Sequence, residues 1–354
     1  MKIVSASPHV HTTMDIRRSM LFVIIALLPS CLWGVYAFGL RALVVLLVSV
    51  ASALLSEYLL GLIDKKNTLP DLSATVTGLL IGMNMPPAIP LYIPVIASFF
   101  AIFVVKWTFG GLGCNWMNPA LAGRVFVFFS FSSAMSTFSA PRALAADALA
   151  SATPLSAVKT AISGGMQNLD YQGVMDQLGY GTTSIAQSIG GALGISPYTV
   201  DAFLGNVGGC IGEVSALFLL VGGIFLIATK VITWHIPVVY LGSFALLSWV
   251  FGGIRSGMGL FSGEVLMPLF TGGLMLGAFF MATDWVTTPT TKKGEVIFAI
   301  GCGFFTFLIR YFGSLAEGVS LAIILMNILT PTIDRYVRPR RFGYVKPVKE
   351  AKKK

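Results

Sequence analysis

Charge is scarce in this sequence. Only 11% of its 354 residues are Asp, Glu, Lys or Arg, whereas 55% are hydrophobic and the mean hydropathy is +0.82. A soluble domain carries about 25% charged residues, so this composition excludes an ordinary soluble fold and indicates an integral membrane protein. The net charge of +9 does not indicate nucleic-acid binding, because nine of the 24 basic residues lie in 335–354, after the last apolar segment. A basic tail there is typical of a cytoplasmic stop that is attracted to anionic lipid.

Clustered cysteines and the usual catalytic motifs are also missing. The four cysteines are scattered singly, so the chain is not expected to hold a zinc ion or an iron–sulfur cluster alone. An inert core position and a ligand shared with a partner protein both stay open for them. No Ser-His-Asp set, P-loop or HExxH motif is present, which leaves hydrolase chemistry without support. Residues 1–19 lack an early apolar core and a cleavage site, so the first span is expected to be retained.

Apolar segments are what the sequence has in abundance. About 20 apolar residues cross a membrane as a helix, and by that measure the sequence predicts an all-α, polytopic membrane protein with ten spans. The expected spans are 20–39, 41–62, 72–85, 91–109, 119–139, 212–232, 236–254, 266–283, 294–312 and 316–334. The expected organisation is a cytoplasmic segment 1–19, a first membrane half 20–139, an external loop 140–211, a second membrane half 212–334 and a basic cytoplasmic tail 335–354.

Basic residues are divided unevenly between the two sides of this topology. With the N-terminus in the cytoplasm, most Lys and Arg residues, including Lys106 and Arg124, fall in inward-facing turns and the tail. Five fall outside, namely Arg41, Arg142, Lys159, Arg255 and Arg310. The positive-inside rule therefore predicts cytoplasmic termini and an external position for the long loop.

Two stretches suggest an inverted repeat. TGLLIGMNM at 77–85 echoes GGLMLGAFF at 272–280, and each is followed by a second similar signal, at 106–111 and at 310–314. In the expected topology the two copies run in opposite directions, and such folds place ligand sites where helices break near the repeat interface. Chance resemblance between Gly- and Leu-rich helices is the alternative. A true repeat would by itself favour a transporter or channel.

A few polar residues could carry chemistry. Asn115 and Asn118 offer donors and acceptors suited to the edge of a heterocycle, but they could equally satisfy helix ends in a tight turn before Pro119. Asp284 lies among threonines near the inner boundary, where a carboxylate is costly unless it is paired, hydrated or functional. Glu57 lies deep in the second span. Glu213 is explained by capping of the sixth span.

Six stretches in a fixed order resemble one family of membrane proteins. They are GLGCNWMNPALAGR, DALASATPL, GEVSALFLLVGGIFL, WHIP, GGLMLGAFFMATDWVTTPTTKKG and AEGVSLAIILMNILTPTIDR. The sequence is therefore identified, from about Ser7 to Arg335, as a member of the RnfD/NqrB family. This family contains the D component of the bacterial Rnf electron-transport complex and its sister, the B component of the sodium-pumping NADH:quinone reductase. The short segment 1–19 before the first span favours the Rnf type.

The resemblance implies a covalently bound flavin. In this family a D-x-x-x-[S/T/G]-A-T motif, often containing S-G-A-T, carries FMN as a phosphoester on its threonine, attached by a flavin transferase on the outer face. The matching positions are Asp147, Ser151, Ala152 and Thr153, with Ser151 where many relatives have glycine. For such an acceptor we expect an exposed loop, with Pro154 restraining Thr153 to an extended conformation that presents its hydroxyl outward.

The resemblance also implies a role and partners. The chain would pass electrons between ferredoxin and NAD in a bacterial inner membrane, coupled to Na⁺ or H⁺ movement, with the A, B, C, E and G components of Rnf. It would hold no metal, would contribute no catalytic residue and would be inactive alone. The sister protein has a second, noncovalent flavin, riboflavin; if it is shared, Asn115 and Asn118 are the expected contacts. Asp284 and Glu57 are candidates for the ion path. The alternatives are the sister protein itself and a small-solute channel on a related scaffold.

Overall fold

The computed structural model describes residues 14–65, 67–142, 153–166, 169–315 and 317–338. Within these ranges every regular element is a helix and no β-strand occurs, which confirms the all-α prediction. Asp147, Ser151 and Ala152 lie outside the described residues.

Helices occupy all ten of the segments that the sequence predicts as spans. They are α1 (Ile16–Phe38), α2 (Leu40–Asp64), α3 (Ser73–Met83), α4 (Tyr92–Phe100) with the π-helix Ala101–Trp107, α5 (Pro119–Ser130), α11 (Ala216–Ala228), α12 (His235–Arg255), α13 (Leu266–Phe270) with α14 (Leu274–Leu276) and the π-helix Gly277–Met281, α15 (Lys292–Tyr311) and α16 (Val319–Tyr336). Among the described residues four of them, α1, α2, α12 and α15, are long and apolar enough to cross a membrane. The others are shorter or interrupted.

The eighth predicted span is not one continuous helix. It breaks between α13 and α14, where Thr271 is extended and Gly272 has a φ of +65°. Gly272 suits this turn because a residue without a Cβ adopts the left-handed region freely. The fifth predicted span is also shorter than expected, because α5 ends at Ser130 and is followed by the single turn α6 (Ser132–Met135).

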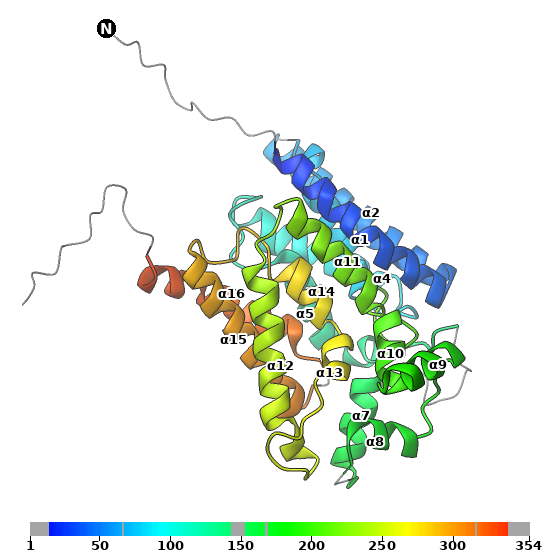
Figure 1. Cartoon of the computed structure of the whole chain (residues 1–354). Helices are drawn as coiled ribbons and strands as arrows, with labels where there is room; N and C mark the ends of the chain where they lie inside the picture. Colours follow the sequence, from blue (N-terminus) through cyan, green and yellow to red (C-terminus); the bar gives the residue numbers. More distant parts are fainter. Residues whose placement is uncertain (1–13, 66, 143–152, 167–168, 316, 339–354) are drawn as a thin grey trace, which may run out of the picture.

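Four short helices gather at one end of the molecule, below the long ones in Figure 1. They are α7 (Pro154–Ser163), α8 (Tyr171–Gln177), α9 (Ser184–Leu193) and α10 (Pro197–Leu204). Helix α9 packs on α10. The helices α7, α8 and α10 share a small hydrophobic core built around Val158, Val174 and Tyr198, and Met267 of α13 belongs to the same core. This contact docks the helices of the predicted external loop onto the second membrane half.

Close helix packing depends on small residues. Gly78 of α3 lies so near α2 that a Cβ placed on it would be 2.8 Å from the Ser49 carbonyl oxygen. Gly303 of α15 is similarly placed against the Tyr240 carbonyl of α12, at 3.0 Å. Such contacts are typical of membrane helices, which associate by close backbone approach because lipid gives no hydrophobic drive between them.

The end of α3 is completed by a segment far away in the sequence. This helix has only 11 residues, about half of what a membrane span requires. The backbone N–H of Gly212 donates to the Met83 carbonyl at 2.8 Å, and that of Ile211 donates to the Met85 carbonyl at 3.1 Å. Ser30 of α1 in turn donates to the Gly212 carbonyl at 3.0 Å. Irregular backbone is thereby paired inside the helix bundle, as it must be away from water.

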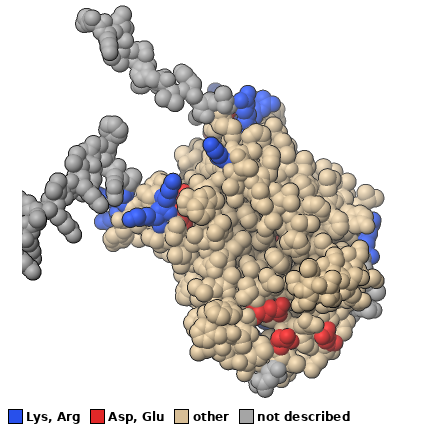
Figure 2. Space-filling model, in the orientation of Figure 1, with Lys and Arg blue, Asp and Glu red and all other residues tan. Residues whose placement is uncertain are grey.

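Surface charge is unevenly distributed over the molecule. Figure 2 shows most of the visible Lys and Arg where α1 begins and around the end of α16, with some acidic atoms beside the latter and a smaller basic patch at the right edge, while the other visible Asp and Glu lie at the opposite end. Three basic residues that the charge count assigns to loops are instead buried. Lys106, Arg124 and Arg310 are each 7% exposed or less, because each is held by acids or backbone carbonyls inside the protein. The loop assignment is wrong for these three residues.

Candidate flavin and ion sites

A large cavity lies among the helix ends that carry the basic surface. We call it the inner cavity; it has a volume of about 1270 Å³. Its walls come from the first turns of α1, α3 and α5, from the end of α11 and from the π-helix that follows α14. The lining residues include Ser19, Thr77, Lys106, Asn115, Asn118, Phe280, Thr283 and Asp284. A mostly apolar cavity of this size with a few polar groups is typical of a small-molecule site.

The inner cavity brings together three of the site residues predicted from sequence. Asn118 caps α5, since its side-chain oxygen accepts from the backbone N–H of Ala120 at 3.0 Å. Its amide nitrogen donates to the Met281 carbonyl at 3.1 Å. Asn118 therefore satisfies the N-terminus of α5, which is the alternative that the sequence left open. Asn115 donates to the Met117 carbonyl at 3.1 Å and is 3.5 Å from a carboxylate oxygen of Asp284.

Asp284 lies just beyond the second π-helix, on the wall of the inner cavity. Thr287 donates to its carboxylate at 3.3 Å. Burial raises the pKa of Asp284 above its ordinary value, while the Val286 backbone N–H and the Thr287 and Asn115 side chains oppose that rise. The carboxylate is thus held by neutral donors, and it can interact with whatever occupies the cavity.

Glu57 does not reach the inner cavity but is connected to it through Lys106. The Lys106 ammonium lies 2.6 and 2.8 Å from the two Glu57 oxygens and 2.6 Å from the Ser73 hydroxyl. Thr68 donates to Glu57 at 2.7 Å. All three Lys106 donors are therefore used, and both Glu57 oxygens are paired. Glu57 completes a saturated buried pair, which is a structural role; as an ion ligand it stays a prediction.

Thr153 is placed differently from the expectation. Its extended conformation, with φ −68° and ψ +145°, is confirmed, but the prediction of an outward hydroxyl is wrong because the residue is only 4% exposed. Its hydroxyl caps α7, accepting from the Ser156 backbone N–H at 3.2 Å. The residue lines a small cavity of about 230 Å³, the outer pocket, together with Gly208, Gly209 and Glu213. The sequence could not show that these segments line one pocket with the threonine.

A buried charge cluster adjoins Thr153. Arg124 of α5 lies 2.6 Å from a Glu317 oxygen and 3.1 Å from a Glu213 oxygen, and it donates to the Ser320 hydroxyl at 2.8 Å. Both acids line the outer pocket. The prediction that Glu213 caps α11 is wrong, because the N-cap of this helix is Ser215. Sequence reasoning missed the cluster, although an arginine within an apolar helix was a signal for it.

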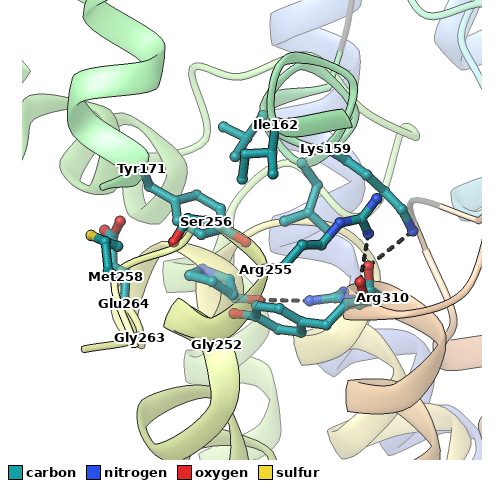
Figure 3. Close-up of a pocket in the computed structure, with 14 residues that line it drawn as sticks. Lys159, Ile162, Tyr171, Gly252, Arg255, Ser256, Met258, Gly263, Glu264 and Arg310 are labelled. Atoms are coloured by element: carbon teal, nitrogen blue, oxygen red, sulfur yellow. Dashed lines mark hydrogen bonds between the residues drawn. The ribbon is translucent and has the colours of Figure 1, made fainter. Parts of the chain in front are cut away.

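A further cavity of about 540 Å³ lies between α7 and the ends of α12 and α15 (Figure 3). Lys159 and Arg255 reach into it and donate to carbonyls at the end of α15, those of Arg310 at 2.9 Å and of Tyr311. Cations at a helix C-terminus satisfy its free carbonyls and oppose its dipole. Burial and, secondly, Asp170 raise the pKa of Glu264 on the same cavity to about 7. We interpret this cavity as the joint that fastens α7 to the membrane half.

The fold and these sites define a helical membrane protein with broken helices, a large inner cavity and a buried charge cluster. The chain belongs to the NQR2, RnfD, RnfE family, whose model matches residues 3–343. The resemblance inferred from the six sequence stretches is thereby confirmed.

Several relatives are similar along nearly their whole length. The chain is 40% identical over 341 residues to the D component of the proton-translocating ferredoxin:NAD(+) oxidoreductase complex of Clostridium ljungdahlii, with 96% of each chain covered. It is also 40% identical over 356 residues to the D component of the Na(+)-translocating ferredoxin:NAD(+) oxidoreductase complex of Acetobacterium woodii, covering 99% of this chain and 98% of the relative. For the D component of the ion-translocating oxidoreductase complex of Stutzerimonas stutzeri the identity is 39% over 356 residues, covering 93% and 92%.

Proposed function

We propose that this chain is the membrane-embedded D component of an ion-translocating ferredoxin:NAD⁺ oxidoreductase and carries one flavin step of its electron transfer. The observation that carries the proposal is the near full-length similarity to components of that name. In this role the chain would span the bacterial inner membrane ten times, with cytoplasmic termini and with α7 to α10 outside. Its partners would be the A, B, C, E and G components of Rnf, and a flavin transferase for maturation.

We propose Thr153 as the attachment point of FMN. Its hydroxyl stands at the N-terminus of α7, where Ser156 already offers a backbone N–H. A phosphate attached there would be stabilised by the free N–H groups and the positive end of the helix dipole. Bound FMN would supply electron transfer in single or paired steps. The chain's own part is to hold the phosphate at the helix terminus and to orient the group through Pro154.

The inner cavity is the proposed place of a second, noncovalent flavin. Its mostly apolar walls with a few polar groups suit a flavin ring system. Asn115 and Asp284 stand together on one wall and could contact the polar edge of the ring. Asn118 would contribute mainly by fixing the first turn of α5, because both ends of its amide are already used.

The test is the intact mass of the denatured chain after co-expression with a flavin transferase. The wild type is expected to carry one FMN-sized increment, and Thr153→Ala is expected to lose it completely. Thr160→Ala is a matched control on the same helix, since Thr160 is exposed whereas Thr153 is buried. An increment that persists in Thr153→Ala, or an unmodified wild type under conditions that modify a known acceptor, would contradict the proposal.

Thr153 is too buried to be modified in the described conformation. We therefore expect flavin transfer to precede the docking of α7 or to require its release. Transfer onto the purified, folded chain should be slower than transfer during synthesis. Weakening the joint with Lys159→Met should speed it, because Lys159 ties α7 to the end of α15. A transfer rate onto the folded chain that this substitution leaves unchanged would mean that the joint does not control access.

A further inference from the structure

The buried charge cluster has more acceptors than donors. Arg124 is the cation in contact with Glu213 and Glu317. Both oxygens of Glu213 and one oxygen of Glu317 accept no hydrogen bond from the described residues, apart from the weak thiol donor of Cys210 beside Glu213. Buried carboxylate oxygens are normally satisfied, because an unsatisfied one carries the full cost of leaving water. Three such oxygens in one place need an explanation.

The surrounding charged groups do not provide the missing donors. Arg310 is another cation near Glu317, but it donates to the carbonyls of Pro268 at 2.7 Å and Thr271 at 3.2 Å. Its guanidinium lies over the ring of Phe244. Arg310 therefore contributes charge from a distance and no hydrogen bond to either acid. Two carboxylates facing one arginine also repel each other, which favours the uptake of a positive charge between them.

The outer pocket gives this positive charge a place. Glu213 is 3% exposed and lines the pocket with Glu317, at a volume of about 230 Å³. The Glu213 carboxylate is packed against Gly273, so closely that a Cβ there would lie 2.6 Å from its oxygen. The glycine and the paired backbone of 211–212 hold the carboxylate in position. The site is thus fixed by the fold and does not depend on a mobile surface side chain.

We propose that Glu213 and Glu317 form a binding site for one exchangeable monovalent cation, a proton or a sodium ion, with Arg124 as its fixed countercharge. Carboxylate oxygens suit both, since they can accept a proton or ligate a hard cation. The site shares the outer pocket with Thr153. A bound cation and any group attached to Thr153 would therefore lie together in the outer pocket. This inference deepens the proposed function, on which it rests, because it assigns residues to the coupled ion.

Infrared difference spectroscopy on the full chain in nanodiscs tests the proposal. One series replaces K⁺ by Na⁺ at constant pH, and the other changes the pH without Na⁺. Glu264, whose pKa is about 7, gives a pH response of its own. Besides it, we expect one carboxyl signal that responds to Na⁺ if sodium binds, or to pH alone if a proton binds. Glu213→Gln should abolish the signal and Glu317→Gln should shift or abolish it. Glu264→Gln, which alters a half-buried acid of the neighbouring cavity, should remove only the pH response of Glu264 and leave this signal in place.

The proposal is overturned if the wild type shows no carboxyl response in either series beyond the pH response that Glu264→Gln removes. It is equally overturned if the response survives in both glutamine variants. Unfolding midpoints of the variants identify any that fail to fold, and Glu213→Asp, which keeps the charge but withdraws it from the pocket, then replaces such a variant and should weaken the response. The mass of the same samples separates this question from flavin attachment. Thr153→Ala should keep the cation response, and Glu213→Gln should keep the FMN increment.

Discussion

Two buried ion pairs, one toward each end of the helix bundle, are made of similar groups but are completed differently. Around Lys106 every donor meets an acceptor, because Glu57 and Ser73 take all three of its protons. Around Arg124 two acids compete for one guanidinium, and three carboxylate oxygens accept no hydrogen bond from the described residues other than the Cys210 thiol. A saturated pair can only be broken, whereas an unsaturated one can gain a ligand. Buried charge alone therefore does not indicate an ion site. A shortage of hydrogen-bond donors relative to carboxylate acceptors does.

The largest expected effect comes from the same substitution made in both pairs. Glu57→Gln should lower the free energy of unfolding by about 3–5 kcal/mol, because it leaves the Lys106 charge buried without a partner. Glu213→Gln should cost less than about 1 kcal/mol, because Arg124 keeps Glu317. Unfolding in mixed micelles measures both. Equal losses would show that the two pairs are equivalent.

A half-buried acid outside these two pairs, Glu264, extends the contrast to pH. The folded protein holds the pKa of Glu264 at about 7, whereas the unfolded chain releases this proton near the ordinary value of 4.5. The folded state therefore binds the proton more tightly, and its stability falls as the pH rises through both values. The fall should be at most about 3 kcal/mol between about pH 4 and about pH 8. In Glu264→Gln the slope of the unfolding free energy against pH should flatten. An unchanged slope would show that other groups cause the pH dependence of stability.

Displacing one acid without removing it is a smaller test. Gly273→Ala puts a methyl group against the Glu213 carboxylate and should cost about 1–3 kcal/mol by overpacking. Its cation response should weaken as well. Gly242→Ala is the matched control, because nothing lies within 4 Å of a Cβ at this exposed position of α12. The control should gain up to about 1 kcal/mol from helix propensity. Similar losses in both variants would show that packing at Gly273 does not hold the carboxylate.

The smallest expected effect separates the two asparagines of the inner cavity. Asn118→Ala should lower the free energy of unfolding by about 1–2 kcal/mol, because α5 loses its cap and its bond to Met281. Asn115→Ala should cost less, since it loses one bond to the Met117 carbonyl and a long contact with Asp284. Flavin content, measured beside stability, should fall more in Asn115→Ala. A larger loss of flavin in Asn118→Ala and a larger loss of stability in Asn115→Ala would show that Asn118 contacts the flavin and Asn115 supports the fold.

Much of the fold could be predicted because it depends on local composition. Apolar length located the ten helical segments, and Asn118 before Pro119 marked the start of α5, which is confirmed. The break at Gly272 was not predicted, since an apolar run conceals a turn whose geometry depends on one residue. The inverted repeat stays a prediction.

The site was predicted in part. The motif pointed to Thr153, but the residue is buried beside a pocket that it lines with Gly208 and Gly209, which lie more than fifty residues away along the chain. The same limitation explains Glu213, which looked like a helix cap because its partner Arg124 is still more distant along the chain. Pairing across the fold cannot be read from spacing. Only the anomaly of an arginine inside an apolar helix was visible beforehand.

The backbone hydrogen bonds between the end of α3 and residues 211–212 have a consequence for biosynthesis. The Met83 and Met85 carbonyls receive their partners from Gly212 and Ile211, which leave the ribosome more than a hundred residues later. Until then the end of α3 lacks these bonds within the bilayer, which is a costly state. We expect the first half to stay beside the insertion machinery or to remain loosely packed during this interval. Assembly of the halves would then be a single late event, with the two halves maturing together.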